Sequence, residues 1–587
     1  MSSPGPQKPS HIREFTPRSV VVGLLVALVI GASYPYMVLK FGFGPNISVV
    51  SAFFGFLALG LFSKSYNRWE NNVVQTAGTS AGQVAFLCWL LAAFDLLRLE
   101  PGSGFDVNLT AFQTWAWLTA SGLLGVFLAV PLRKHFIDDE NLPFPDGIAA
   151  GETLILLDAH GPQARKSAYA MVGALAASGL VFLATVLQWV RDTIPLAVND
   201  FSPRVGLGFG VSLLSIGSGI IIGLRISASM LIGGIVAWVL MPPWLVSQGL
   251  LAADGRRVDV LLLVMWPSVG MLVAGGICAL LLRWRVLMGT FRSLAAADAT
   301  SGDLPLHWVA IGGTLSTLAL IAVQSYFFAT PVWHSVLAIV LSVPLGLVAL
   351  RVLGETNWGP ISTMTNVMQA MFAVIAPGDL RASMVSSGIT GAVAAESEGL
   401  MQDFRAGAMI GSTPRILTYM QLLAVPVGAL ALAVMYPLLR DTYGIVGEGA
   451  QLLSPTSQRW VGFAKLVTQD LSGAGASAEA MARLSWMQTS TAVGAVIGVA
   501  LTLLEQRKSW RPFVPSPAGV GIAMLIPVSA VTVIFLGAVL DWVWTRVSPA
   551  TQKHYAIASA SGLIAGEALV AVLIPLLVTI GIMSLPG

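Results

Sequence analysis

The chain has 587 residues, of which 55% are hydrophobic and only 10% are charged, and its mean hydropathy is +0.78. A soluble domain carries roughly 25% charged residues, so this composition excludes an ordinary soluble protein and indicates a multi-pass membrane protein. The net charge of +3 is small and the basic residues are dispersed, which excludes a nucleic-acid-binding stripe. Both cysteines lie in apolar runs, so no disulfide framework or cysteine-based metal site is expected, and no cofactor is indicated.

The predicted elements follow a basic, proline-rich tail over residues 1–17, which we expect in the cytoplasm. After this tail the chain alternates between short polar connections and apolar runs of about 20 residues, the length of an α-helix that crosses a bilayer. We predict an all-α polytopic membrane protein with about 16 transmembrane helices. They lie near residues 18–39, 45–63, 72–96, 110–131, 167–190, 207–223, 228–246, 258–283, 306–328, 332–353, 357–376, 384–400, 415–438, 484–505, 517–538 and 555–583.

Two connections contain an apolar or amphipathic piece that is too short to cross the membrane. They are residues 141–160 (NLPFPDGIAAGETLILLDAH) and residues 452–470 (LLSPTSQRWVGFAKLVTQD). Both are predicted to be re-entrant or interfacial segments.

Lysine and arginine residues in the connections indicate the orientation. Basic residues at 8–18, 64–68 and 133–134 lie on the same side of the predicted helices, which the positive-inside rule assigns to the cytoplasm. With an even number of helices, both termini are then cytoplasmic in a cell-membrane protein. The connection over 439–483 departs from the rule, because its four basic residues lie on the predicted outer side.

The sequence also indicates an internal duplication with an offset of about 310 residues. FGPNIS at 43–48 resembles WGPIS at 358–362, and the two short segments correspond in the same way. We predict three regions: a first repeat over 18–246, connecting helices over 258–328 and a second repeat over 332–583. The offset pairs the first helix with the tenth, so inverted repeats are expected, as in alternating-access transporters. One miscounted helix would make them parallel, and chance similarity among Gly- and Ala-rich helices is the alternative.

A polar strip runs along one face of the third predicted helix. Its members are Asn72, Gln75, Thr76, Thr79, Ser80 and Gln83. Such a face avoids lipid, so it either forms hydrogen bonds to neighbouring helices or lines a pathway for a peptide-like substrate. The corresponding helix of the second repeat carries Ser386, Ser387 and Thr390. We therefore expect a central substrate site between these two helices.

Two segments place glycine and proline where a transmembrane helix should begin. FGFGPN (41–46) and ETNWGP (355–360) predict broken or unwound helix starts, which often border substrate sites. Further candidates for the pathway near these breaks are Asn357, Asn366, Gln369 and Tyr34. For Tyr34 an interfacial aromatic anchor is the alternative.

Charged residues concentrate in ESEGLMQDFRAGAMIGSTPR at 396–415. The block contains the carboxylates Glu396, Glu398 and Asp403 and the basic residues Arg405 and Arg415. A charge at the bilayer centre costs about 2.5–3.5 kcal/mol, so these carboxylates need partners or water, and the two arginines are the nearest candidates. Either the block is a solvated cytoplasmic helix end, or one carboxylate accepts protons or acts as a gate.

Glu567 is a separate candidate for proton coupling because it lies in a long apolar run with no basic residue within a dozen positions. An intramembrane carboxylate is a functional candidate, although an interhelical hydrogen bond would also explain it. Glu152, on the first short segment, is the second choice.

Four segments resemble the oligopeptide transporter superfamily, and most closely its yellow-stripe-like, metal-chelate branch. They are LMQDFRAGAMIGSTPR (400–415), PLRKHFIDDENLPFPDGIAAGETL (131–154), NNVVQTAGTSAGQVAF (71–86) and GLIAGEAL (562–569). The resemblance implies proton-coupled uptake of small peptides or metal complexes of amino-acid-derived chelators. The chain departs from the family pattern at Glu398, Arg405 and Ala406, the last two of which replace a lysine and a threonine, and this leaves the substrate open.

Two other classes of function compete with a transporter. A channel would need a selectivity filter or a ring of charges, and none is evident in the sequence. An intramembrane enzyme would have to use Glu396, Glu398 and Asp403, which lack a recognisable nucleophile or metal partner. We therefore expect a non-enzymatic transporter whose partners are its small-molecule substrate, protons and the lipid bilayer, and a homo-oligomer is compatible with this reading.

Overall fold

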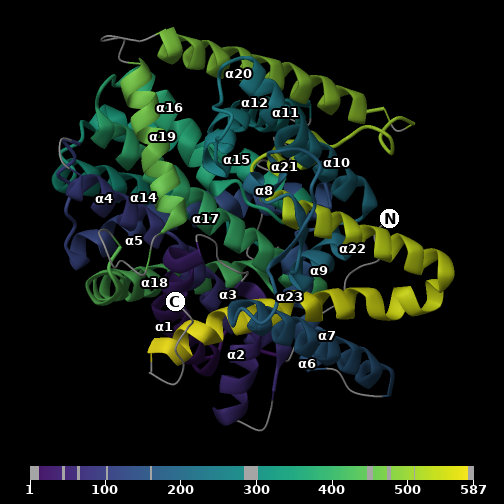
Figure 1. The fold of residues 1–587 in the computed structure, drawn as a ribbon. Helices are drawn as coiled ribbons and strands as arrows, with labels where there is room; N and C mark the ends of the chain where they lie inside the picture. Colours follow the sequence, from purple (N-terminus) through teal and green to yellow (C-terminus); the bar gives the residue numbers. More distant parts are fainter. Residues whose placement is uncertain are drawn as a thin grey trace.

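The computed structural model describes residues 12–41, 47–62, 66–100, 103–158, 162–282, 302–445, 452, 454–471, 478–507 and 509–579. The expected all-α polytopic architecture is confirmed (Figure 1). In the described part of the chain, eleven helices are long and apolar enough to cross a membrane. The predicted number of sixteen spans and the re-entrant character of the two short segments stay predictions.

The helices of the first half are α1 (Pro17–Phe41), α2 (Ile47–Phe62), α3 (Arg68–Phe86), α4 (Cys88–Leu99), α5 (Ala111–Ala129), η1 (Val130–Leu132), η2 (Lys134–Asp139), α6 (Pro145–Leu157), α7 (Pro162–Val186), α8 (Ser202–Val205), α9 (Leu213–Ile222), α10 (Leu224–Ile235), η3 (Val236–Leu240), α11 (Met241–Ser247) and α12 (Arg257–Leu282). The helices of the second half are α14 (Leu306–Phe327), α15 (Val332–Thr356), α16 (Ile361–Ile375), α17 (Leu380–Ile410), α18 (Pro414–Tyr443), α19 (Pro455–Leu471), α20 (Ala478–Glu505), α21 (Pro517–Ala523), α22 (Val528–Val547) and α23 (Pro549–Thr579). Two short strands, β1 (Thr193–Pro195) and β2 (Gly208–Gly210), pair antiparallel with Ile194 opposite Phe209.

Several predicted helix boundaries differ from the structure, and two of these differences have a clear cause. The span expected over 517–538 is divided into α21 and α22, because Pro527 has no N–H to continue the helix and instead precedes the first turn of α22. The helix expected to end near residue 400 continues to Ile410 as α17, where Gly411 in the left-handed conformation (φ 76°) ends it. This second difference changes the environment of the charged block.

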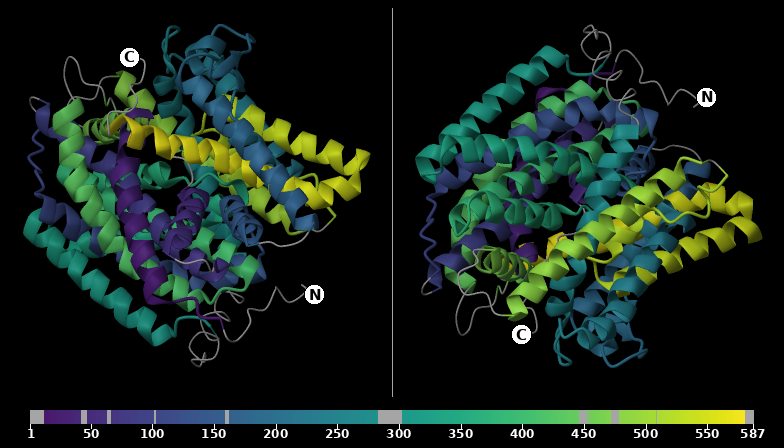
Figure 2. Two further views of the ribbon diagram at one scale, coloured as in Figure 1. Left: turned by 90° about the horizontal axis from the view of Figure 1, so that it is seen from below. Right: turned by 90° about the horizontal axis from the view of Figure 1, so that it is seen from above.

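The centre of the molecule is formed by α1, α3, α4, α5 and α15 to α18, whose buried side chains make up the largest hydrophobic cluster. Outside this core, α7 packs along α23 and α12 packs along α20, and Figures 1 and 2 show these two pairs in different parts of the periphery. Both pairs cross at glycines. A methyl group on Gly566 of α23 would lie 2.1 Å from the carbonyl oxygen of Leu175, and one on Gly494 of α20 would lie 2.0 Å from that of Pro267. These glycines therefore let the helix backbones touch.

The starts of α6 and α19 are built alike. Phe144 and Ser454 each precede the proline that begins the helix, and both have left-handed backbones, with φ of 43° and 42°. The N–H of Phe144 donates to the carbonyl oxygen of Gly354 near the end of α15, at 3.0 Å. The N–H of Ser454 donates to the carbonyl oxygen of Leu39 near the end of α1, at 2.8 Å. Each short helix thus begins against the end of a long helix from the other half, α6 against α15 and α19 against α1.

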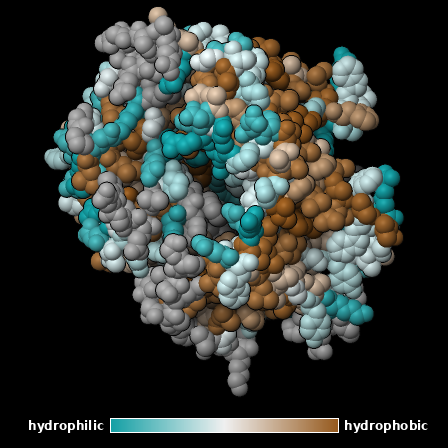
Figure 3. All heavy atoms as spheres, viewed as in Figure 1, coloured by the Kyte–Doolittle hydropathy of each residue, from teal (hydrophilic) through white to brown (hydrophobic). Residues whose placement is uncertain are grey.

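Outward-facing helices carry apolar side chains. Only 17% of the apolar window of α7 and of α14 is buried inside the protein. Figure 3 shows a largely hydrophobic surface with a hollow rimmed by hydrophilic residues, in the region where α15 and α17 are labelled in Figure 1. The outer surface is suited to lipid, and polar groups are concentrated toward the interior.

Candidate functional site

The three carboxylates of the charged block lie in the middle of α17. Glu396 and Asp403 are 0% exposed and Glu398 is 3% exposed. The expectation of a solvated helix end is therefore wrong. Because α17 is 31 residues long, the block is carried into the protein interior.

The carboxylates meet the polar face of α3. Glu396 accepts hydrogen bonds from Ser80 Oγ at 3.1 Å and from Gln421 Nε2 at 2.9 Å. Asp403 accepts a hydrogen bond from Gln75 Nε2. Thus α3, α17 and α18 together form one buried polar site, which we call the acidic site and define by Glu396, Glu398, Asp403, Gln75, Ser80 and Gln421.

Hydrogen bonds within α3 order the remaining amides and hydroxyls of its polar face. Asn72 Nδ2 donates to Gln75 Oε1 at 2.7 Å, and Gln75 Nε2 also donates to Thr79 Oγ1 at 3.1 Å. Thr79 in turn donates to Ser48 Oγ of α2 at 3.2 Å, while Thr76 donates to the carbonyl oxygen of Asn72. Most of the strip is therefore hydrogen-bonded to the acidic site, within α3 or to α2.

No cation neutralises the acidic site in the described residues: no Lys, Arg or His nitrogen lies within 4.0 Å of its carboxylate oxygens. The expected partners are engaged elsewhere, since the Arg405 guanidinium donates to Asn141 Oδ1 at 3.0 Å. The backbone N–H of Arg415 donates to the Gly302 carbonyl oxygen at 2.9 Å. Both basic residues were thus wrongly assigned to the carboxylates.

One oxygen of each carboxylate is buried and accepts no hydrogen bond from the described residues. These atoms are Oε1 of Glu396, Oε1 of Glu398 and Oδ2 of Asp403. A buried, unpaired carboxylate oxygen is costly, so each is a place where a proton or a donor group of a ligand is stabilising. The described residues contain no group of three or more His, Cys, Asp or Glu that could hold a metal ion.

Glu398 packs against the non-helical segment between α15 and α16, which we call the break. A methyl group added to Gly359 would lie 1.9 Å from Glu398 Oε2, so only a glycine permits this approach. Gln83 of α3 packs on the next residue of α17, since a methyl group on Gly399 would lie 2.7 Å from Gln83 Cγ. The acidic site therefore extends from α3 to the break.

The second predicted break is present. α15 ends at Asn357, which has a left-handed backbone (φ 63°), and α16 begins after Pro360. Asn357 Nδ2 donates to Asp146 Oδ1 at 2.7 Å, and the Asp146 N–H donates to Asn357 Oδ1 at 3.1 Å. The start of α6 is thereby fixed to the break. The first predicted break, FGFGPN, lies mostly outside the described residues.

The polar residues expected to face α3 from the second repeat point elsewhere. Thr390 shares a 2.8 Å hydrogen bond with Ser342 of α15, and Ser387 donates to the carbonyl oxygen of Met384 in its own helix. Ser386 is buried on the same part of α17. The α3 face meets α17 two to three turns further along, at 396–403. The expected contact between Ser386 to Thr390 and the polar face of α3 is therefore not formed, and a substrate role for these residues stays a prediction.

Three other predicted pathway residues are buried in the core. Gln369 Nε2 donates to the Met384 sulfur at 3.3 Å, and Asn366 and Gln369 each have a buried side-chain oxygen without a partner. Tyr34 is only 4% exposed and belongs to the largest hydrophobic cluster, so it is not an interfacial anchor.

Glu567 lies apart from the acidic site. Its carboxylate accepts hydrogen bonds from Ser212 Oγ at 3.0 Å and from the Leu214 N–H at 3.1 Å. Ser212 is the N-cap of α9, so Glu567 completes the N-terminus of that helix. Glu152 is partly buried on α6.

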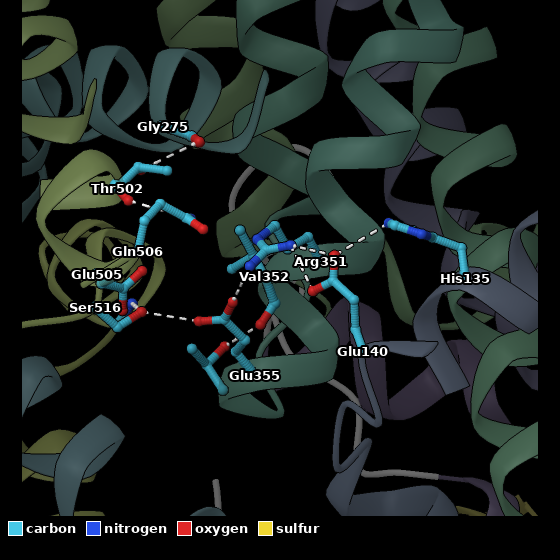
Figure 4. A network of polar contacts seen from close by, with 12 residues as sticks. His135, Glu140, Gly275, Arg351, Val352, Glu355, Thr502, Glu505, Gln506 and Ser516 are labelled. Carbon is cyan, nitrogen blue, oxygen red and sulfur yellow. Dashed lines mark hydrogen bonds and ion pairs between the residues drawn. The ribbon is translucent and has the colours of Figure 1, made fainter. Parts of the chain in front are cut away.

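A network of charged side chains that the sequence reasoning missed connects the two halves (Figure 4). Arg351 of α15 donates to Glu140 at 2.8 Å and lies 3.1 Å from Glu355. His135 Nε2 lies 3.0 Å from Glu140, and Ser516 at the start of α21 donates to Glu355 at 2.8 Å. Arg351 and Glu355, spaced i and i+4 at the end of a long apolar run, were the available signal.

A family model described as OPT oligopeptide transporter protein matches residues 14–578. The "Putative oligopeptide transporter" of Haemophilus influenzae is 26% identical, with 92% of each chain covered. A "Probable metal-nicotianamine transporter" of Arabidopsis thaliana is 24% identical over 95% of this chain and 86% of the relative. A "Putative oligopeptide transporter" of Saccharomyces cerevisiae is 22% identical over 97% of both. These relatives are named as transporters, and the chain is a multi-pass membrane transporter, not an enzyme. It belongs to the OPT oligopeptide transporter family.

Proposed function

We propose that this transporter couples the uptake of oligopeptides, or of metal complexes of amino-acid-derived chelators, to the inward movement of protons. The observation that carries the proposal is the acidic site. Its three carboxylates are buried, Glu396 and Asp403 accept hydrogen bonds from neutral amides and a hydroxyl, and no cation lies beside them among the described residues. Such carboxylates favour either a bound proton or a bound donor group, and exchange between the two links substrate to protons.

The available energy is sufficient for accumulation. Moving one charge through 100 mV is worth about 2.3 kcal/mol, which corresponds to a roughly fifty-fold concentration ratio. No nucleotide is needed for this driving force.

Alternating access between two inverted repeats is the proposed mechanism. It is supported by the matching starts of α6 and α19 and by the break at Asn357 beside Glu398. We propose that α15, α16 and α17 change their packing around the acidic site, and that the Arg351 network opens and closes the cytoplasmic side. A cell-membrane location, cytoplasmic termini and a homo-oligomeric assembly belong to the same proposal.

Transport into proteoliposomes tests the proposal. The purified protein would be offered di- to pentapeptides and iron or nickel chelates, with and without an inward proton gradient. We expect accumulation above equilibrium only with the gradient, and collapse of accumulation when a protonophore is added. Equal accumulation under both conditions would show that protons are not the coupling ion.

A further inference from the structure

Three tryptophans deep in the protein have an indole N–H that finds no hydrogen-bond acceptor among the described residues. They are Trp89 of α4, Trp117 of α5 and Trp460 of α19. Each is among the largest fully buried side chains, with at most 1% of its surface exposed. A buried donor without a partner is destabilising, so these three N–H groups need an explanation.

Other tryptophans of this protein are paired. Trp69 Nε1 donates to the carbonyl oxygen of Ile410 at 3.0 Å, and Trp238 Nε1 donates to that of Ala523 at 3.3 Å. Trp238 is as deeply buried as the three unpaired tryptophans. Burial alone therefore does not leave an indole N–H unpaired in this fold.

The three unpaired tryptophans belong to one group of rings. The rings of Trp89 and Trp460 lie edge to face, with their centroids 4.9 Å apart. Phe94 joins them to Trp117, because its ring stacks on Trp117 at 5.7 Å and on Trp460 at 6.4 Å. An edge-to-face contact can offer one N–H the face of a ring, but this is a weak hydrogen bond. We call Trp89, Phe94, Trp117 and Trp460 the aromatic site.

The aromatic site and the acidic site lie along the same pair of helices, α5 and α17. A methyl group on Gly388 of α17 would lie 2.6 Å from Trp117 Cζ2 of α5. Further along the pair, a methyl group on Gly122 of α5 would lie 3.3 Å from Glu396 Cγ of α17. From residue 388 to residue 396 an α-helix advances about 12 Å. The two sites are therefore neighbours, about 12 Å apart along α17.

Unpaired acceptors accompany these unpaired donors. A methyl group on Gly391 would lie 3.0 Å from Thr365 Cγ2 of α16 and 3.9 Å from Trp89 Cζ2. Asn366, which follows Thr365, and Gln369, one turn later, each have a buried side-chain oxygen without a partner in the described part of the chain. Donors and acceptors are thus left over in the same region, and a peptide group carries the complementary C=O and N–H.

We propose that the aromatic site is a second subsite of the transport pathway, where the indole N–H groups bind main-chain carbonyl oxygens of the substrate. The rings pack on one another in this structure, so it shows the closed form of the subsite, and the substrate enters when the rings separate. An extended chain advances at most about 3.3–3.6 Å per residue, so about 12 Å corresponds to three or four residues. The amino group of the substrate then lies at the acidic site. The inference rests on the proposed transport function and adds the residues that bind the rest of the substrate.

Thermal unfolding of the full-length protein in detergent tests the subsite with trialanine and ω-aminooctanoate as probes. In both molecules the same number of main-chain bonds separates the amine from the carboxylate, but only trialanine has peptide groups. We expect trialanine to raise the unfolding temperature of the wild type in a saturable manner. Its apparent affinity should be at least about 10-fold higher than that of ω-aminooctanoate, because several hydrogen bonds are lost with the peptide groups.

Replacing Trp117 by benzothienylalanine removes only the N–H, because a sulfur atom takes the place of this group in a ring system of similar size. The apparent affinity for trialanine should fall about 2- to 10-fold, as expected for one hydrogen bond, while that for ω-aminooctanoate stays unchanged. Trp460→Phe, which also removes an indole N–H, should lower the trialanine affinity in the same direction. The same isosteric replacement at Trp238 is the matched control and should leave both affinities unchanged.

The ligand-free proteins provide a second readout. The isostere at Trp117 removes an unpaired buried donor, so the unfolding temperature should equal or exceed that of the wild type. The isostere at Trp238 leaves the Ala523 carbonyl oxygen without its donor, so the unfolding temperature should fall. A fall at Trp117 as large as that at Trp238 would show that the Trp117 N–H is already paired within the protein.

Three further outcomes would overturn the assignment: no stabilisation of the wild type by trialanine, equal affinities for trialanine and ω-aminooctanoate, or trialanine affinities that are unchanged in both the Trp117 and Trp460 variants. Trialanine binding that depends on the indole N–H, without gradient-driven accumulation, would refute proton coupling and leave the subsite intact. Gradient-driven accumulation of trialanine that does not depend on the indole N–H would refute the subsite alone.

Discussion

Asp403 and Glu396 show how the position of one residue in a helix decides its chemistry. The nearest basic residues in the same block are Arg405 and Arg415, yet the neighbours of the two carboxylates in space are Gln75, Ser80 and Gln421. Neutral donors leave the charge of a carboxylate uncompensated, so its protonation state can follow ligand binding.

Asp403→Asn is expected to uncouple transport from the proton gradient. The amide keeps the size of the side chain and can still accept from Gln75, but it cannot ionise. Gradient-driven accumulation in proteoliposomes should fall at least tenfold, while exchange of labelled for unlabelled substrate without a gradient continues. Asp254→Asn, in the exposed loop before α12, is the control and should behave as wild type. Intact gradient-driven accumulation in Asp403→Asn would exclude Asp403 as a coupling residue.

Glu567→Gln is expected to leave the pH dependence of transport unchanged. Glu567 accepts hydrogen bonds at the N-terminus of α9. A glutamine oxygen can accept the same hydrogen bonds from Ser212 and Leu214. Glu567→Leu, which removes the acceptor, should lower the free energy of unfolding by about 1–3 kcal/mol. Transport at pH 5.5 to 8 and thermal melting check both statements. A flattened pH profile in Glu567→Gln would assign proton coupling to this residue instead.

At the scale of helices, glycine decides which pairs can pack backbone to backbone. The pairs α7 with α23 and α12 with α20 pack in the same way. In each pair a glycine of one helix lies against a backbone carbonyl oxygen of the other. In lipid such close packing replaces the hydrophobic drive that water provides.

Gly566→Ala should therefore destabilise the protein, whereas Gly173→Ala should not. The new methyl group at 566 would lie 2.1 Å from the Leu175 carbonyl oxygen, while nothing lies within 4 Å at 173. We expect a loss of about 1–3 kcal/mol for the first and a small gain, up to about 1 kcal/mol, for the second. Thermal melting monitored by size-exclusion chromatography measures both. Similar melting temperatures for the two variants would contradict close packing of α7 and α23.

Helices were predictable from the sequence where apolar runs are long, and less predictable where polar residues continue a buried helix. Hydropathy located α1, α5, α12, α14 and α15 because their runs match the bilayer thickness. It ended α17 too early, because a helix enclosed by other helices need not be apolar, and Glu396 to Asp403 face α3 and not lipid. The residues that α3 and α17 contribute to the acidic site were therefore identified, but Gln421 of α18 was missed, and the contacts between the helices required the packing of α3 and α18 on α17.

For the whole molecule, charged side chains join parts that are distant in the sequence. The Arg351 network connects the segment before α6, the end of α15 and the start of α21 (Figure 4). Glu140 is 3% exposed and Arg351 14% exposed, so this ion pair is shielded from solvent. Breaking a buried pair costs more than the pair itself contributes, because one charge is left alone.

Arg351→Gln should consequently lower the free energy of unfolding by about 3–5 kcal/mol. The double variant Glu140→Gln with Arg351→Gln should lose less than the sum of the two single variants, because no buried charge then remains unpaired at Glu140. Thermal melting of the four proteins forms the complete cycle. Additive losses would show that the two side chains do not interact.

The matching starts of α6 and α19 also have a consequence for biosynthesis. The carbonyl oxygen of Leu39 receives its hydrogen bond from Ser454, which is translated roughly 400 residues later. At about 5–20 residues per second, the end of α1 is made on the order of half a minute before this partner. In the other pair, Phe144, which donates to the Gly354 carbonyl oxygen, is translated before Gly354. The contact that joins α19 to α1 therefore forms late in synthesis, whereas the contact between α6 and α15 can form as soon as α15 is made.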